Sequence, residues 1–290
     1  MQTSTQMYLD QFTVSMDLCG YAEVTKKSYH ANLRMYLQFI DKDPKDADYE
    51  DVRRYLHHLI KERKLSPEYI NVAYSAIKIF YETTLRREWN MKHIPRIKKK
   101  LGLPKVLSVE QVKRLLDATV NLKHKAILTV AYSAGLRVNE LTHLRVSDID
   151  SKNMRIHVRF GKGGYERTSI LSSDALLLLR EYWKAYRPKD WLFPGMAEGK
   201  PITTTTAERV YKQMLDKAGL GKDSSFHALR HSFATHLLND NENINTIREL
   251  LGHTSLVSTT RYLHLVDAKI LNLKSPQDNW TKKPEDENEH

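Results

Sequence analysis

The first half of the chain has the hydrophobic pattern of a helical protein. Apolar and aromatic residues recur every three or four positions over residues 24–40, 48–60 and 67–85. This spacing places them on one face of an α-helix, the face that packs inward. No alternation of apolar and polar residues interrupts these stretches. We therefore expect a helix over each of these ranges.

The second half also contains helices. One is expected to begin at Ser108, because Ser108 and Gln111 have the spacing of a capping box. A largely apolar helix follows over residues 123–134 and ends at Gly135. Further helices are expected from Asp174, from Thr206 and in three segments after Phe226.

Between these helices the pattern changes to that of two strands. Ile156, Val158 and Phe160 alternate with polar residues, and a glycine-rich stretch follows at residues 161–164. Alternation followed by glycines is typical of a β-hairpin. The expected fold is therefore mainly α-helical with a small antiparallel β-sheet.

Length and composition limit the class of protein. The chain has 290 residues, of which 41% are hydrophobic and 28% charged, an ordinary globular composition for about two domains. Its single cysteine, Cys19, excludes a disulfide scaffold or a cysteine-rich zinc module and fits a reducing cytosol. No apolar run approaches the roughly 18 residues of a membrane helix, and no secretory signal is visible. We expect a cytoplasmic protein with no membrane partner.

The net charge of +11 points to a polyanion as partner, although a protein can also simply be basic. Cations are densest over residues 86–105, where eight of them stand against Glu88 alone. So dense a run favours a surface that contacts phosphate. The DNA-binding candidates in this run are Arg86, Arg87, Arg96, Lys98, Lys99 and Lys100.

Two segments carry groups that suit an anion. Arg137 comes directly after the helix that ends at Gly135, and His227 and Arg230 have a spacing that places them on one helical face. Each has a plainer interpretation. Arg137 could cap a helix or pair with Glu140, and the other two could form an ordinary polar surface.

A third segment ends in a histidine and a tyrosine. His253 follows Gly252, which is typical of a helix end, and Tyr262 comes nine residues later on an expected short helix. Tyr262 is one of fifteen tyrosines, most of which belong to core or surface. His227 and His231 also have a metal-ligand spacing, but no carboxylate or cysteine stands nearby to complete a site.

Together these segments resemble the tyrosine recombinases, the phage integrase and Xer family. The resemblance rests on Gly-Leu-Arg, His-Ala-Leu-Arg-His-Ser-Phe-Ala-Thr-His-Leu, Leu-Leu-Gly-His and Ser-Thr-Thr-Arg-Tyr-Leu-His, in that order. It implies a helical, SAM-like core-binding domain over residues 1–90 and a basic linker over 91–105. A catalytic domain that carries the hairpin follows over 106–280, and a polar tail over 281–290.

The resemblance implies roles that agree with the chemistry of the residues. Arg137 and Arg230 would donate to the nonbridging oxygens of a DNA phosphate, and His253 would add a hydrogen bond. Tyr262 would be the nucleophile. His227 would assist proton transfer or position the nucleophile.

Two further residues take roles from the resemblance alone. Lys162, in the turn of the hairpin, matches the lysine that protonates the leaving 5′ oxygen in this family; a plain phosphate contact is the alternative. Glu140 matches a frequent acidic position, and we expect it to orient an arginine.

The implied reaction is site-specific DNA recombination. Tyr262 would form a 3′-phosphotyrosyl link, and strand exchange would pass through a Holliday junction, with no metal, ATP or other cofactor. The implied partners are double-stranded DNA with specific sites, a homotetramer of two dimers joined through C-terminal tails, and accessory proteins or a second recombinase. The resemblance places such a protein with the bacterial or archaeal nucleoid, in integration, excision, transposition or resolution of mobile DNA.

Three alternatives stay open at this point. A type IB topoisomerase uses similar chemistry to relax DNA without exchanging partners. A DNA-binding protein that has lost catalysis would keep the fold. A metal-dependent nuclease built on the histidines is disfavoured by the lack of paired acidic ligands.

Overall fold

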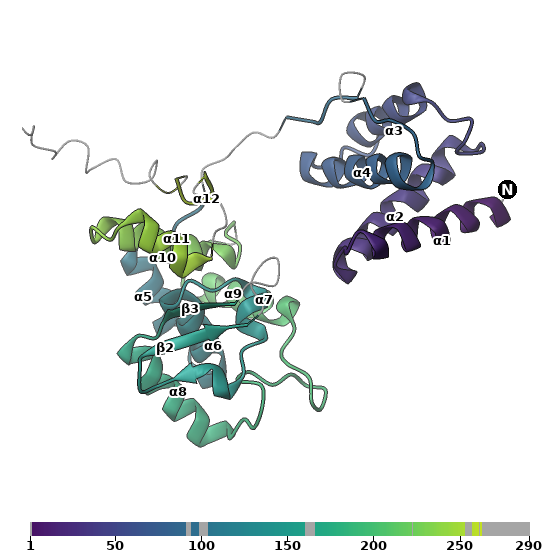
Figure 1. The fold of residues 1–290 in the computed structure, drawn as a ribbon. Helices are drawn as coiled ribbons and strands as arrows, with labels where there is room; N and C mark the ends of the chain where they lie inside the picture. Colours follow the sequence, from purple (N-terminus) through teal and green to yellow (C-terminus); the bar gives the residue numbers. More distant parts are fainter. Residues whose placement is uncertain are drawn as a thin grey trace, which may run out of the picture. The chain divides into compact units, whose positions relative to one another are not determined.

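A computed structural model describes residues 2–90, 94–98, 104–159, 166–221, 223–252, 257–260 and 262. The chain divides into two compact units, Met1–Gly102 and Leu103–His290 (Figure 1). Both are mainly helical, and the second contains a small antiparallel sheet, as the sequence predicts. No helix in these ranges is long and apolar enough to span a membrane.

The N-terminal unit is built from helices alone among its described residues. They are α1 (Gln2–Leu18), α2 (Glu23–Ile40), α3 (Tyr49–Lys61) and α4 (Pro67–Ile79), which runs on into a π-helical turn, η1 (Phe80–Thr84). The helices predicted over 24–40, 48–60 and 67–85 are confirmed, the last with this wider final turn. Helix α1 was not predicted, because polar residues separate the few apolar ones, such as Phe12 and Met16, that it buries.

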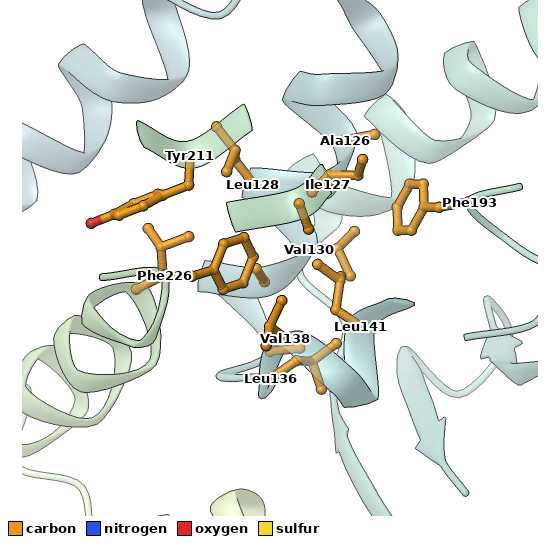
Figure 2. Packing of buried hydrophobic residues seen from close by; sticks show 14 of the residues in the cluster. Ala126, Ile127, Leu128, Val130, Leu136, Val138, Leu141, Phe193, Tyr211 and Phe226 are labelled. Atoms are coloured by element: carbon orange, nitrogen blue, oxygen red, sulfur yellow. The ribbon is translucent and has the colours of Figure 1, made fainter. Parts of the chain in front are cut away.

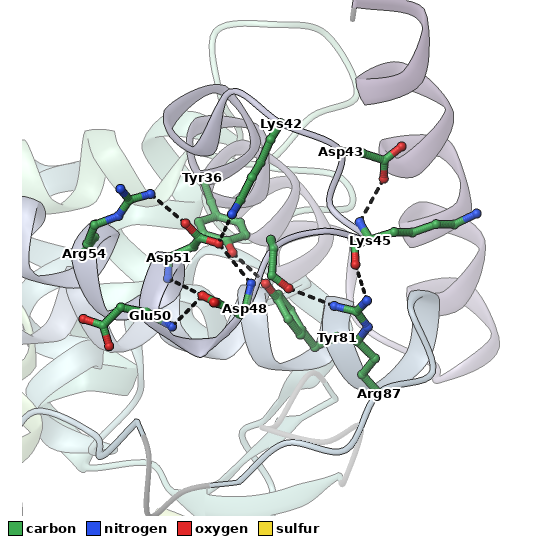
Figure 3. A network of polar contacts seen from close by, with 11 residues as sticks. Tyr36, Lys42, Asp43, Lys45, Asp48, Glu50, Asp51, Arg54, Tyr81 and Arg87 are labelled. Atoms are coloured by element: carbon green, nitrogen blue, oxygen red, sulfur yellow. Dashed lines mark hydrogen bonds and ion pairs between the residues drawn. The ribbon is translucent and has the colours of Figure 1, made fainter.

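Side chains fix where these helices begin. The Asp48 carboxylate accepts hydrogen bonds from the backbone N–H groups of Glu50 and Asp51, and the Asp51 carboxylate accepts one from the Asp48 backbone N–H (Figure 3). Reciprocal bonds of this kind satisfy the free N–H groups at a helix start. Ser66 caps α4 in a similar way, with Pro67 in the first turn.

Part of the expected linker packs against the N-terminal helices. The Ile94 side chain is buried, and its carbonyl accepts a hydrogen bond from the Tyr74 hydroxyl at 3.0 Å. The Asn71 side-chain amide donates to the carbonyl of Ile97, also at 3.0 Å. Residues 94–97 thus lie against α4 rather than crossing open solvent.

The C-terminal unit begins with three helices that lead to the sheet. These are α5 (Val109–Asp117), α6 (Leu122–Ser133) and α7 (Val138–Thr142), followed by a 3-10 turn, η2 (Val146–Asp148). The capping box at Ser108 and Gln111 is confirmed at the start of α5. The middle of α6, residues 126–131, is buried on every side, as its largely apolar sequence requires.

The sheet has three antiparallel strands in the order β1 (Ile149–Asp150), β2 (Arg155–Val158) and β3 (Arg167–Ile170). Strands β2 and β3 form the predicted hairpin, with Val158 opposite Arg167. The turn that joins them lies outside the described residues. The short strand β1 was not predicted, because two residues are too few to show an alternation.

Helices complete the unit: α8 (Ser173–Tyr186), α9 (Thr204–Lys217), α10 (His227–Asn239), α11 (Ile244–Leu251) and α12 (Val257–Thr260). Apolar residues of α6, α7 and the segments around them meet at the centre (Figure 2). At one end, α11 contacts both α10 and β3. This end brings together most of the residues singled out in the sequence.

Candidate active site

The carboxylate of Glu140 lies buried among three arginines from different parts of the chain. Its oxygens are 2.6 Å from Nη1 of Arg137, 2.7 Å from Nη2 of Arg167 and 3.5 Å from Nη1 of Arg230. Only 1% of the Glu140 side chain is exposed. The cluster therefore joins α7, β3 and α10 around one negative charge.

Burial alone would raise the pKa of Glu140. Arg167, the backbone N–H of Arg137, Arg230 and the Arg137 side chain together outweigh this effect and lower the pKa below its usual range. Glu140 is consequently ionised at neutral pH.

Arg137 reaches this position through a turn that only glycine can make. Gly135 has a φ of +59°, and a Cβ added there would lie 2.4 Å from the Phe233 ring. The backbone N–H of Arg137 then donates to Glu140 at 2.8 Å. The plainer interpretation, a pair with Glu140, thus holds, yet 22% of the Arg137 side chain stays exposed and able to meet a ligand.

Arg230 is held more tightly. Its Nη1 donates to the carbonyl of Gly135 at 2.8 Å, and its Nη2 donates to the carbonyl of Leu251 at 2.5 Å. Burial and the positive charge of Arg137 lower the pKa of Arg230 to about 9, with Glu140 acting in the opposite direction. The guanidinium therefore stays charged at neutral pH.

His227 is the first residue of α10, one helical turn before Arg230. Its side chain is exposed. Desolvation by neighbouring protein atoms, with Arg230 and Arg137, lowers the pKa of His227. An imidazole with a lowered pKa is neutral at pH 7, the form that accepts a proton.

Tyr262 lies in the turn directly after α12, and not on that short helix as expected. Its side chain is only 1% exposed and packs with Phe233 and Leu251. The Tyr262 hydroxyl is 2.9 Å from Nδ1 of His231, one turn along α10 from His227. The negative charge of a Tyr262 phenolate would act on Arg230, so the tyrosine belongs to the same electrostatic cluster.

The sequence missed the parts played by His231 and Arg167. His231 was considered only as a metal ligand, and among the described residues no three His, Cys, Asp or Glu side chains gather as a metal site would require. Its distance of four residues from His227 was the available signal. Arg167 gave no signal, because its partners Glu140 and Leu250 are distant in sequence.

Two expected site residues, Lys162 and His253, lie outside the described residues, as do Lys99 and Lys100. Of the other DNA-binding candidates, Arg86 and Lys98 are exposed. Arg87 is exposed as well, but its guanidinium is engaged, because it donates to the carbonyls of Ala47 and Lys45 (Figure 3). It therefore braces the connection between α2 and α3.

Arg96 also contacts other side chains of the N-terminal unit. Its guanidinium lies over the Tyr74 ring, 4.9 Å from the centroid, and donates to the Ser75 hydroxyl at 3.1 Å. The side chain is exposed, so these contacts orient it and leave it open to solvent.

Comparison with known proteins identifies the family. Residues 105–269 match the phage integrase family, and residues 8–91 match the N-terminal SAM-like domain of phage integrases. A putative integrase/recombinase of Sinorhizobium fredii is 38% identical over 262 residues, which cover 90% of this chain and 85% of that protein. Tyrosine recombinase XerA of Saccharolobus solfataricus is 33% identical over 264 residues, covering 88% and 87%.

Solved structures agree. The crystal structure of XerA recombinase has 31% sequence identity and a TM-score of 0.53, with 92% of this chain and 96% of that chain covered. XerH site-specific recombinase bound to palindromic difH substrate shares the fold, with a TM-score of 0.69 at 21% identity and coverage of 86% and 78%. The chain belongs to the phage integrase family of tyrosine recombinases, and the resemblance seen in the sequence is confirmed.

Proposed function

We propose that this protein is a site-specific recombinase that cuts and rejoins double-stranded DNA through a covalent link to Tyr262. The observation that carries the proposal is the meeting of Arg137, Arg230 and Tyr262 around one end of α10. They come from segments far apart in the sequence. A buried carboxylate that orients arginines beside a tyrosine suits phosphate chemistry better than a structural core.

The charges of the cluster suit a phosphodiester. Three guanidiniums surround one carboxylate, which leaves this cluster of four side chains with a net charge of +2. The exposed edge of Arg137 would bind a nonbridging oxygen, and Arg230 would bind the other. In the transition state the extra negative charge on phosphorus strengthens both contacts.

The family resemblance supplies the remaining steps, and the chemistry of each group is compatible with them. Tyr262 Oη would attack phosphorus, form the 3′-phosphotyrosyl bond and release the 5′ oxygen. Lys162 would protonate that oxygen, His253 would donate to the phosphate, and neutral His227 would assist proton transfer or position the tyrosine. The 5′-hydroxyl of a second duplex would then attack the link and free the tyrosine.

Recombination requires more than one copy of the chain. Two such exchanges would pass through a Holliday junction in a tetramer on two DNA sites, with no metal, ATP or other cofactor. The exposed Arg86 and Lys98 of the N-terminal unit would contact the phosphate backbone. The proposal covers integration, excision, transposition or resolution of DNA elements.

A covalent adduct assay tests the proposal. Purified protein is incubated in EDTA with nicked duplexes drawn from DNA that flanks its own gene, and SDS-resistant complexes are counted. Wild type should form them, whereas Tyr262→Phe should bind the same duplexes and form none. Relaxation of supercoiled DNA without recombinant products would favour a topoisomerase, and binding without adducts would contradict catalysis.

A further inference from the structure

Arg167 is a buried cation that the proposed chemistry does not use. It is the first residue of β3, and only 8% of its side chain is exposed. One end of its guanidinium pairs with Glu140 at 2.7 Å, and the other donates to the carbonyl of Leu250. It therefore joins the hairpin strand to α7 and to the last turn of α11.

Arg167 and Arg230 both connect Glu140 to the last turn of α11. Both bind Oε2 of Glu140, at 2.7 Å and 3.5 Å, and both bind carbonyls of the last turn of α11, at Leu250 and Leu251 respectively. The two arginines thus make equivalent links between α7 and α11. A shift of either Glu140 or that turn would move both guanidiniums together.

Arg167 is a poor choice for stability alone. Desolvation lowers its pKa, and its buried Nε–H has no hydrogen-bond partner among the described residues. A buried charge with an unsatisfied donor costs free energy that an apolar residue of the same size avoids. This cost favours a functional reason for an arginine at this position.

We propose that Arg167 is a positioning residue that sets Glu140 and the end of α11 so that Arg137 and Arg230 meet the scissile phosphate. This inference rests on the proposed function. Arg167 holds Oε2 of Glu140 and leaves Oε1 to Arg137. It also holds the carbonyl that precedes the one bound by Arg230.

The position requires a guanidinium. Its planar fork donates to a carboxylate and to a carbonyl at the same time, whereas a lysine ammonium on its flexible stem does not reproduce this geometry. Gly252 leaves room for the stem, because a Cβ added there would lie 2.5 Å from Cδ of Arg167. Arg167→Lys should therefore keep the charge and lose the bridge.

The test measures single-turnover cleavage of a nicked duplex by wild type, Arg167→Lys and Arg167→Met, all at saturating protein and below their melting temperatures. Cleavage by Arg167→Met should fall by roughly 10²-fold, about the loss of one transition-state donor, with unchanged DNA affinity. Arg167→Lys should lie between the two. If Arg167→Met does not fold, Arg167→Lys carries the test.

Arg114→Met is the matched control. Arg114 of α5 also donates to a backbone carbonyl, that of Ala218 at the end of α9, at 2.7 Å, and it is not one of the three arginines around Glu140. This variant should melt earlier and, once folded, cleave at the wild-type rate. Cleavage by Arg167→Met at the rate of Arg114→Met would overturn the inference.

A second substrate separates positioning from loss of structure. A duplex with a methyl group in place of a nonbridging oxygen lacks the charge that Arg137 and Arg230 bind. On this substrate the loss caused by Arg167→Met should shrink, whereas a general structural defect would reduce cleavage of both substrates equally and overturn the inference. If wild type forms no adduct while binding DNA, the proposed function itself fails, and this inference fails with it.

Discussion

The hydroxyl of Tyr262 lies 2.9 Å from Nδ1 of His231, and only 1% of the tyrosine is exposed. The proposed nucleophile is therefore buried from solvent in the protein without DNA. Cleavage requires a phosphate to reach this hydroxyl, so we predict that DNA binding makes Tyr262 more accessible.

Replacement of His231 by phenylalanine should remove the hydrogen bond to Tyr262 and make the tyrosine accessible to solvent more often. A hydrogen bond of this kind contributes roughly 0.5–1.5 kcal/mol, which corresponds to as much as about a tenfold increase in the open population. Nitration of Tyr262 by tetranitromethane, followed by mass spectrometry, measures the change. Tyr211, which is buried elsewhere in the same unit, serves as the internal control. Equal nitration of Tyr262 in both proteins would show that His231 does not hold it.

Arg137→Ala and Arg230→Ala should each slow cleavage by roughly 10²–10³-fold, because each removes a donor to the transition state. Their effects on folding should differ. Loss of Arg230 leaves the buried carbonyls of Gly135 and Leu251 without this donor, at a cost of about 1–3 kcal/mol each. Urea denaturation should therefore show a larger loss of unfolding free energy for Arg230→Ala than for Arg137→Ala, because Arg137 is partly exposed. Equal losses would contradict the tighter anchoring of Arg230.

The lowered pKa of Glu140 predicts an acid-dependent contribution to stability. Because its pKa in the folded state lies below the unfolded value of about 4.3, ionised Glu140 contributes fully above that pH. The contribution is lost as pH falls through the folded pKa. The free energy of unfolding of wild type relative to Glu140→Gln should be constant near neutral pH and should fall in acid. A difference that does not change with acidification would contradict the assigned charge.

Gly252→Ala offers a second view of Arg167. Gly252 and Gly199 both have positive φ, +60° and +67°, so alanine strains the backbone at either position by about 1–2 kcal/mol. Only at Gly252 does the new Cβ meet Arg167. Gly252→Ala should therefore lose cleavage activity in the single-turnover assay, whereas Gly199→Ala should lose stability alone. Equal cleavage by the two variants would contradict the account.

The hydrophobic period predicted most of the helices, because in a long amphipathic segment the spacing of neighbouring apolar residues shows which face is buried. Helix α1 was not predicted, since Thr, Ser and Gln residues lie among its apolar residues and obscure the helical period. The packing of residues 94–97 against α4 was not predicted for another reason. Its contacts with Tyr74 and Asn71 lie 20 and 26 residues away, and no local pattern records them.

The candidate site divides in the same way. Glu140 was expected to orient an arginine, and the spacing of three residues from Arg137 made that contact foreseeable. The bond from Arg167 to Leu250 spans 83 residues, and the bond from His231 to Tyr262 spans 31. In addition, Arg167 lies on the same face of β3 as the buried Ser169. Because both residues are polar, the sequence does not mark this face as the one that points inward.

The decisive measurement is the identification of the residue that carries the DNA. Adducts trapped on a nicked duplex would be digested with nuclease and protease, and the modified peptide sequenced by mass spectrometry. We expect a nucleotide joined through its 3′-phosphate to Tyr262 and to no other residue. A 5′-linked nucleotide, or a link to any other side chain, would contradict it.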